Sequence, residues 1–462
     1  MPTRLSKFAI SATCKDYVHP WTNSCINAST GLGLYALQES LRIYSMLYLI
    51  ALLTKGRLPT VSDMKKTFLS IMQSTAFLTW SAFTFSMFTC VFRKLFGNFN
   101  VISVSFMPSF VSSFTALFIE RPSRHPMLCL YVSNIATETL FRMAVSRGYL
   151  SAIPGGEIYI FAAGVTTLLY LFRSKSNIDD SIYKIIRFIV GPCETKAYKE
   201  RNITVDTKQS SSKINSGRRE KPINSMLKLV YKALKVYEMM INKIKTLGGK
   251  HTTCPHPNSC LHYVLGGAHK MFSLGLGVQM VLNVVFSMEK LFKKPHLFKK
   301  VLFKKGTFDL ALFLGGFASL YKMVSCSLRR ACNKDSPRYA IPAGLIASMS
   351  FYMYPSNTIA LYFAWKALQM LWNNGVESGQ VPEVKWFVKF LYCFSTAVLF
   401  HAAIMEPKNL RVSYWKFLYN LSGGRVAAMS RVPLDGFGLE SRKQLQEVLK
   451  ISRTTDKHNF PF

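Results

Sequence analysis

"FLSIMQSTAFLTWSAFTFSMFTCVF" (68–92) is a run of apolar and small polar residues without a single charged side chain. A helix needs about 20 such residues to cross the hydrocarbon core of a bilayer, so this run predicts a transmembrane helix. Seven further blocks of similar character occupy residues 31–54, 101–119, 157–172, 261–286, 308–328, 340–354 and 386–405. The sequence therefore predicts an all-α, polytopic membrane protein.

The charge of the chain is strongly positive, with 58 Lys and Arg against 23 Asp and Glu. These basic residues gather between the apolar blocks, and "KKPHLFKKVLFKKG" (293–306) alone holds six lysines. Basic loops beside membrane spans fix the orientation of the spans and contact anionic lipid headgroups. We therefore expect the bilayer and its anionic headgroups as partners, and no nucleic acid.

Two His-Pro elements, "HPWTNSC" (19–25) and "HPNSC" (256–260), mark an internal repeat. The paired motifs that follow them are "RIYS" (42–45) with "KMFS" (270–273), "CVFRK" (90–94) with "CSLRR" (326–330), "RPS" (121–123) with "YPS" (354–356), and "LYVSNIATETLFRMAVSRG" (130–148) with "LYFAWKALQMLWNNGVESG" (361–379). Because these elements recur in one order, they indicate two homologous halves, 14–175 and 254–406, with four to five membrane helices each.

The predicted organisation has five parts. They are a cysteine-containing N-terminal segment (1–32), a first membrane repeat (33–175), an amphipathic and polar linker (176–253), a second membrane repeat (254–406) and a basic C-terminal tail (407–462). Within the linker, 192–224 is polar and rich in Ser, Lys and Arg, which is typical of a flexible segment. The neighbouring stretches 182–190 and 226–244 are apolar at helical spacing with lysines between, and predict helices on the membrane surface.

The relative orientation of the halves depends on the segments 130–148 and 361–379, which are the least apolar of the repeated elements. If these segments span the bilayer, each half has five crossings and the halves are inverted. If they do not span it, each half has four crossings and the halves are parallel. The basic loop after the first span of both halves, at 55–66 and 293–305, favours the parallel arrangement.

The cysteines and histidines near the two His-Pro elements admit three interpretations. The candidate metal ligands are Cys14, His19, Cys25, Cys254, His256 and Cys260. Together they offer more thiolates and imidazoles than a tetrahedral zinc site needs, but their spacings match no standard zinc module. The same cysteines can form disulfides in an oxidising compartment, or remain free thiols.

Ionisable residues within or beside the apolar blocks are few. The chief ones are Glu39 with Arg42 and Glu138 with Arg142. Such residues can form a polar path across a membrane protein, because a charge within the membrane is costly and is usually retained where it binds a substrate or a coupling ion. They can equally neutralise each other locally, because their spacings place them on one helix face. Phosphate-binding, zinc-protease and serine-hydrolase motifs are absent from the sequence, so we expect neither an enzyme nor a cofactor.

The sequence also resembles a known family. "ESLRIYSMLYLIA" (39–51), "NIATETLFRMAVSRG" (134–148), "RFIVG" (187–191) and "SYWKFL" (413–418) are similar to the transmembrane protein 135 family. The likeness extends over nearly the whole chain, including its two-part layout and polar linker. A shorter and weaker likeness, in "FLGGFASLYKMVSCSLRR" (313–330) and "IPAGLIAS" (341–348), is to the superfamily of mitochondrial inner-membrane translocase channels and small peroxisomal membrane proteins.

The first resemblance implies a multi-pass protein of peroxisomal and mitochondrial membranes that regulates mitochondrial fission and lipid and energy metabolism, with the fission machinery as a possible partner. It carries no catalytic residues over to this chain. The alternative is a transporter or channel, for a lipid such as cholesterol or for a small metabolite, formed between the two repeats. That alternative requires polar residues, namely Gln38, Glu39, Gln73, Glu138 and Gln279, to face one cavity.

Overall fold

A computed structural model of the chain describes residues 8–53, 59–174, 180–195, 249–304 and 306–456, with single positions at 236, 239, 240, 243 and 460. Most of the polar linker 192–224 and almost all of the expected surface helix 226–244 lie outside these residues. The chain divides into two compact units: unit 1 comprises 1–153 and 376–462, and unit 2 comprises 154–375. Each unit is described separately.

Within the residues that the structure describes, unit 1 is built from nine α-helices and short connecting elements. The helices are α1 (Cys14–Tyr17), α2 (Cys25–Leu53), α3 (Val61–Phe96), α4 (Phe106–Leu117), α5 (His125–Ser146), α16 (Phe387–Met405), α17 (Val412–Leu421), α18 (Arg425–Ala428) and α19 (Ser441–Ser452). The 3₁₀ turns are η1 (Pro122–Arg124), η6 (Pro407–Asn409) and η7 (Pro433–Phe437), and β1 (Ala9–Ile10) pairs antiparallel with β2 (Phe99–Asn100).

Unit 2 contains eight α-helices in the part of the chain that the structure describes. They are α6 (Gly156–Ser174), α7 (Ser181–Val190), α10 (Cys260–Phe286), α11 (Met288–Lys293), α12 (Phe298–Leu302), α13 (Asp309–Cys332), α14 (Ala340–Ser348) and α15 (Asn357–Glu377). The 3₁₀ turns are η2 (Pro192–Glu194), η3 (Pro295–Leu297), η4 (Pro337–Tyr339) and η5 (Met349–Met353).

The predicted fold class is confirmed: most described residues are helical, almost none is in a strand, and every predicted apolar block overlaps a helix. Among the described residues, four helices are long and apolar enough to cross a membrane, namely α3, α10, α13 and α16. By contrast, α4 has 12 residues and α14 has 9, fewer than the roughly 20 that a straight crossing needs. The number of crossings in each half therefore stays a prediction.

Helix α3 shows how local sequence defines an element. Thr60 accepts a hydrogen bond from the backbone N–H of Asp63, and the Asp63 carboxylate accepts one from the backbone N–H of Thr60. This capping box satisfies backbone donors that the first turn leaves without partners. The helix ends at Gly97, whose φ of 71° is accessible to glycine at little cost. Both ends of α3 are therefore specified by residues next to the apolar run.

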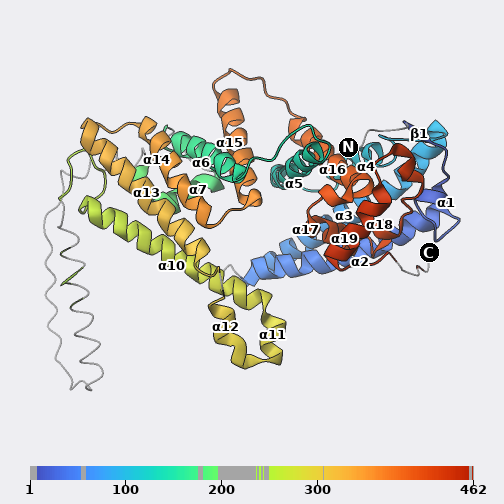
Figure 1. Cartoon of the computed structure of the whole chain (residues 1–462), viewed down its shortest axis with the longest axis horizontal. Helices are drawn as coiled ribbons and strands as arrows, with labels where there is room; N and C mark the ends of the chain where they lie inside the picture. The colour runs from blue at the N-terminus through green and yellow to red at the C-terminus, as the bar shows by residue number, and fades with distance from the viewer. Residues whose placement is uncertain are drawn as a thin grey trace. The chain divides into compact units, whose positions relative to one another are not determined.

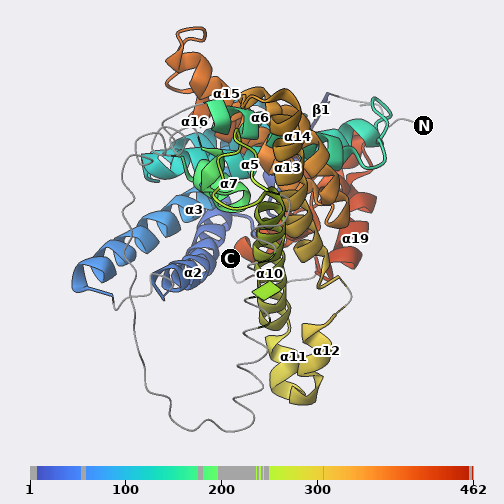
Figure 2. The same ribbon diagram turned by 90° about the vertical axis from the view of Figure 1, so that its left-hand side faces the viewer.

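The last helix of each half packs in the unit of the other half. In unit 1, α2 packs along α3 (Figure 2) and α4 packs on α3, while α16 from the second half packs on α4 and α5. In unit 2, α10 packs along α13 (Figure 1) and α14 packs on α13, while α6 from the first half packs on α14. The pairings of α2, α3, α4 and α16 in unit 1 thus match those of α10, α13, α14 and α6 in unit 2, except that α16 also packs on α5. The two halves exchange their last helices.

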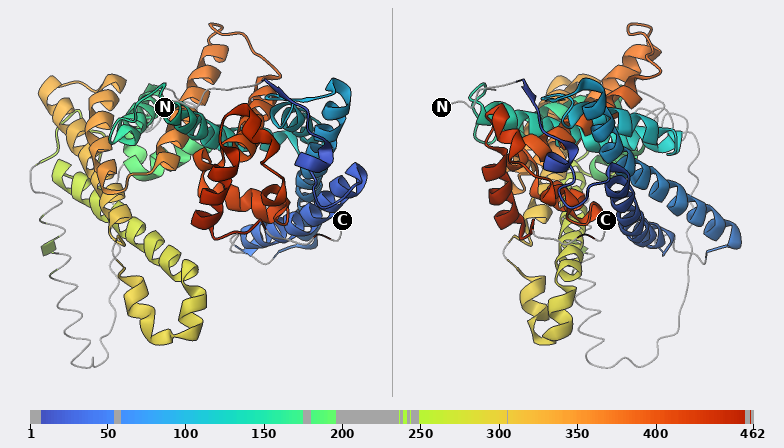
Figure 3. Two further views of the ribbon diagram at one scale, coloured as in Figure 1. Left: turned by 45° about the vertical axis from the view of Figure 1, so that its right-hand side comes forward. Right: turned by 90° about the vertical axis from the view of Figure 1, so that its right-hand side faces the viewer.

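The segment 407–462, whose sequence is basic, contributes to the core of unit 1. Its helices α17, α18 and α19 form one group (Figure 3). Trp415 on α17 is fully buried, and it belongs to the same apolar cluster as Leu399 of α16 and Leu449 of α19. Burial of large side chains such as these is a main source of folding free energy. The segment is therefore a structural part of unit 1.

Glycines allow close helix contacts inside unit 2. A Cβ atom at Gly164 of α6 would lie 2.8 Å from the backbone nitrogen of Ala364 of α15, and one at Gly344 of α14 would lie 2.8 Å from Thr166 Oγ1 of α6. A Cβ atom does not tolerate contacts of 2.8 Å, and at Gly164 the neighbouring atom is backbone, so the helices themselves would have to move. Small residues that let helices approach closely are the usual device in membrane interiors.

We expect Gly164→Ala to lower the free energy of unfolding by about 1–3 kcal/mol, because it overpacks the contact between α6 and α15. The matched control is Gly266→Ala on α10, where an added Cβ meets no atom within 4 Å. That control should be neutral, or stabilise the helix by about 0.5–1 kcal/mol through alanine's higher helix propensity. Thermal unfolding in detergent compares the two variants, and equal shifts would contradict the prediction.

Candidate functional site

The first candidate site lies in unit 1 and joins the N-terminal segment to the α2–α3 hairpin. Cys14 lies in α1, His19 follows it in a loop, Cys25 is the first residue of α2, and Cys90 lies near the end of α3. The thiol sulfurs and one imidazole nitrogen of these four residues all lie within 4.8 Å of one another. His19 Nε2 is 3.2 Å from Cys25 Sγ. His19 and Cys90 are buried, and the other two are partly buried.

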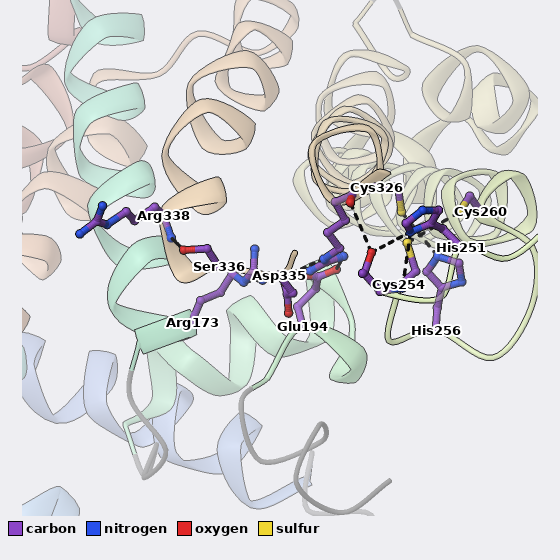
Figure 4. A network of polar contacts seen from close by, with 12 residues as sticks. Arg173, Glu194, His251, Cys254, His256, Cys260, Cys326, Asp335, Ser336 and Arg338 are labelled. Carbon is purple, nitrogen blue, oxygen red and sulfur yellow. Dashed lines mark hydrogen bonds and ion pairs between the residues drawn. The ribbon is translucent and has the colours of Figure 1, made fainter. Parts of the chain in front are cut away.

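The second candidate site has the same composition and lies in unit 2 (Figure 4). Cys254 and His256 lie before α10, Cys260 is the first residue of α10, and Cys326 lies near the end of α13. Their ligand atoms also lie within 4.8 Å of one another. Cys254 Sγ is 3.9 Å from Cys260 Sγ, and Cys326 Sγ is 3.5 Å from His256 Nε2.

The structure thus places all six predicted candidates in clusters, three in each unit, and adds one cysteine to each. The added residues are Cys90 and Cys326, which the search for metal ligands missed. Both were visible in the repeat as the cysteine that opens "CVFRK" and "CSLRR". Cys90 and Cys326 are far from the His-Pro elements in the sequence, but they occupy equivalent positions in the two copies of the repeat. That equivalence was the signal that could have identified them.

Both histidines are held in the same orientation. His19 Nδ1 lies 2.9 Å from the carbonyl oxygen of Thr22, and His256 Nδ1 lies 2.6 Å from that of Asn258. A carbonyl oxygen only accepts, so Nδ1 must donate its proton, and in the neutral ring Nε2 then carries the lone pair. In both clusters Nε2 is the atom that faces the thiols.

Contacts inside the clusters change the acidity of the groups that lie outside the spans. A hydrogen bond from the Cys90 thiol, assisted by His19 and opposed by burial, lowers the pKa of Cys14 to about 5. Burial disfavours the charged form of His19, but hydrogen bonds with Cys14, Thr22 and Cys25 outweigh it and raise the pKa to about 9. A hydrogen bond from Cys326, assisted by His256, lowers the pKa of Cys254 to about 4. Both clusters thus favour a thiolate at neutral pH.

A buried ion-pair network adjoins the second cluster (Figure 4). The Arg329 guanidinium, whose side chain is 0% exposed, donates through Nη1 to Glu194 Oε1 at 3.0 Å and through Nε to Asp335 Oδ1 at 2.9 Å. Arg173 also pairs with Asp335. The network meets the cluster through Tyr263, whose ring stacks on His256 and whose hydroxyl donates to Glu194. No pairing in this network was predicted from the sequence.

The residues predicted for a polar path form ion pairs. Arg42 lies 3.8 Å from Glu39 on α2, and Arg142 lies 2.5 Å from Glu138 on α5. Glu138 is also paired with Arg411, whose Nε donates to Glu138 Oε2 at 2.7 Å. Both carboxylates therefore have the local partners that their spacing predicts, and Glu138 has an additional one from the C-terminal segment.

Unit 1 also contains a partly open, apolar cavity of about 470 Å³. Its walls come from α2, α3, α5, α16 and α17, with residues such as Leu32, Phe77, Phe85, Tyr392 and Phe417. Residues Gln38, Glu39, Gln73, Glu138 and Gln279, which a transport path would use, do not line it. The cavity has the size and apolar lining of small-molecule sites in proteins.

An all-α chain whose described residues include four helices long and apolar enough to cross a bilayer is a polytopic membrane protein. Residues 11–145 match the family model of the N-terminal cysteine-rich region of Transmembrane protein 135. This match confirms the resemblance to the transmembrane protein 135 family over the N-terminal part of the chain, including all four residues of the first cluster. No solved structure matches the chain. The weaker superfamily likeness stays a prediction.

Proposed function

We propose that the protein is a regulator of lipid metabolism and mitochondrial dynamics in peroxisomal and mitochondrial membranes, and that it acts by binding a lipid in the unit 1 cavity. The organelles and the link to fission rest on the family resemblance. The cavity is the observation that carries the lipid-binding part of the proposal.

The shape of the cavity suits a long, narrow ligand. Its lining extends along α2 from Ala28 to Leu47, which corresponds to roughly 28 Å of helix. Most of the wall is apolar, and few polar groups interrupt it. A sterol or an acyl chain has this shape and would replace water at the apolar wall, which is the main source of affinity for such ligands.

The cavity lining includes polar groups that suit the head of the ligand. Trp21, Ser422 and Arg425 are among them, and both the Trp21 ring and the Arg425 guanidinium contact the ring of Phe460. The Trp21 Nε1 donor is buried and has no hydrogen-bond partner among the residues that the structure describes. A buried donor of this kind is stabilised when a ligand oxygen accepts from it. The cavity therefore favours an amphiphile with an oxygen-bearing head and a long apolar body.

The test uses the full-length protein in lipid nanodiscs with photoactivatable sterol and fatty-acid probes. We expect saturable labelling that maps to α2, α3 and α17. Leu32→Trp fills the cavity from α2 and should weaken binding by roughly tenfold, or about 1.4 kcal/mol. Leu34→Trp is the matched control, because Leu34 lies on the same helix and is 53% exposed. Absence of saturable labelling, or an equal loss in the control, would contradict lipid binding.

The cellular part of the proposal is tested separately. Cells that lack the protein are complemented with wild type, Leu32→Trp or Leu34→Trp, and mitochondrial length and lipid-droplet content are measured. Leu32→Trp should fail to restore both quantities, and Leu34→Trp should restore them. If Leu32→Trp loses lipid binding but restores both, the cavity has no part in the cellular role.

A further inference from the structure

The two cysteine and histidine clusters have the dimensions of a tetrahedral zinc site. With Zn–S bonds of about 2.3 Å and Zn–N bonds of about 2.0–2.1 Å, a tetrahedron places sulfurs about 3.8 Å apart and sulfur and nitrogen about 3.5 Å apart. The separation of Cys254 Sγ and Cys260 Sγ is 3.9 Å, and that of Cys326 Sγ and His256 Nε2 is 3.5 Å. In the first cluster, His19 Nε2 lies 3.2 Å from Cys25 Sγ. Small side-chain adjustments would therefore admit the ion.

The orientation of both imidazoles also matches metal binding. A histidine that binds zinc usually donates its other ring N–H to a carbonyl or carboxylate, which fixes the tautomer and the direction of the lone pair. The carbonyls of Thr22 and Asn258 accept from His19 and His256 in this way. If the cysteines of a cluster formed a disulfide instead, the lone pair on Nε2 of the histidine would have no metal ion to bind.

Two loops of different length place their ligands in the same arrangement. In the first half the ligands before the span follow the pattern Cys-x4-His-x5-Cys, whereas in the second half they follow Cys-x-His-x3-Cys. In both halves the fourth ligand comes from near the end of the second long helix, as Cys90 or Cys326. Loops of different length converge on one set of ligand positions, as is expected if the ligand geometry is the constraint.

The donor set identifies the class of metal. In both clusters the grouped atoms are three thiol sulfurs and one imidazole nitrogen, without an oxygen ligand. This soft set suits Zn²⁺ and does not suit Mg²⁺ or Ca²⁺, which prefer oxygen. Four protein ligands complete a tetrahedron and leave no open position for a substrate, which is typical of a structural site.

We propose that each cluster binds one Zn²⁺ ion, and that the two ions fasten the segment before each half to its first helical hairpin. The thiols that bind the metal release their protons to water. In each half, the ion joins the first residue of one long helix, Cys25 or Cys260, to the end of the next, and both to the preceding loop. The two zinc ions thus close the same end of the two equivalent hairpins.

The first zinc site has a further structural consequence in unit 1. Cys14, Cys25 and Cys90 border an apolar cluster that contains Tyr17, Phe99, Met405 and Phe437. The ion would thus hold the N-terminal segment against residues from the C-terminal part of the chain. Loss of this site is expected to loosen α1 and η7 together, whereas loss of the second site leaves them in place.

Metal content of the purified full-length protein tests the proposal. Elemental analysis should give two zinc ions per chain for wild type, one for Cys90→Ser, one for Cys326→Ser and none for the double variant. Cys332→Ser is the control, because Cys332 is exposed and belongs to neither cluster. This variant should retain two ions.

A second measurement covers the case in which the serine variants do not fold. His19→Cys and His256→Cys keep four ligands and should keep two zinc ions. After exchange for Co²⁺, each should shift the visible d–d bands of one tetrahedral site from a three-thiolate to a four-thiolate spectrum. Wild type without stoichiometric metal would overturn the proposal, as would an intact mass that shows disulfides within the clusters, or metal that remains in the double variant.

Discussion

Replacing Glu194 by Gln is expected to lower the free energy of unfolding of unit 2 by about 3–5 kcal/mol, because it leaves a buried charge without its main partner. Glu194 and Arg329 have side chains that are 0% exposed. Without the Glu194 carboxylate, Arg329 must share Asp335 with Arg173. A glutamine fills nearly the same volume, so the loss reflects charge and not packing.

Thermal unfolding in detergent, followed for unit 2 by limited proteolysis, measures this effect. Glu39→Gln is the matched control, since Glu39 and Arg42 are 3.8 Å apart and the Arg42 side chain is 74% exposed. Because Arg42 stays hydrated when it loses its partner, an i,i+3 pair of this kind contributes about 0.3–0.5 kcal/mol. Similar shifts in the two variants would show that the buried network does not stabilise unit 2.

The same network predicts a dependence of stability on pH. Burial opposes ionisation of Glu194, but the positive charge of Arg329 and its hydrogen bonds outweigh burial and hold the pKa of Glu194 below its ordinary value. A carboxyl with a lowered pKa stabilises the folded state above its unfolded pKa of about 4.3, and the contribution is lost as the pH falls through the folded pKa. The difference in stability between wild type and Glu194→Gln should therefore shrink below about pH 4.

The helices could be predicted because their signal is local. The uncharged run 68–92 is long enough to specify a helix, and Thr60, Asp63 and Gly97 mark its ends. The exchange of α6 and α16 between the halves could not be predicted in this way. Apolar surfaces in lipid carry little information about which helix they contact, because small residues and side-chain shape decide the pairing.

The candidate site was predicted only as far as its residues are close in the sequence. The three ligands in and around each His-Pro element could be identified together. Cys90 and Cys326 could not, because they lie on long apolar helices, where cysteine usually packs as a small apolar residue. Glu138 illustrates the same limit. Its spacing predicts the pair with Arg142, but nothing local indicates Arg411, which lies 273 residues away.

The pair of Glu138 with Arg411 predicts the second large change in the free energy of unfolding. Glu138→Gln is expected to lower the free energy of unfolding of unit 1 by about 3–5 kcal/mol, because Arg411 is left in a poorly hydrated position. Glu138 is 7% exposed, and the Arg411 side chain is 16% exposed. Arg142, the other partner of Glu138, is 42% exposed and can be hydrated instead.

The effect should concentrate at α17, since Arg411 is the N-cap residue of this helix and pairs with Glu138 of α5. Limited proteolysis should therefore cut Glu138→Gln faster within 407–456 than wild type, while Arg142→Gln, the matched control, is cut at nearly the wild-type rate. Combining Glu138→Gln with Arg411→Met should recover part of the lost stability, because the double change removes both charges and fills the position with an apolar side chain. Full additivity of the two substitutions would mean that the pair does not hold the C-terminal helices on unit 1.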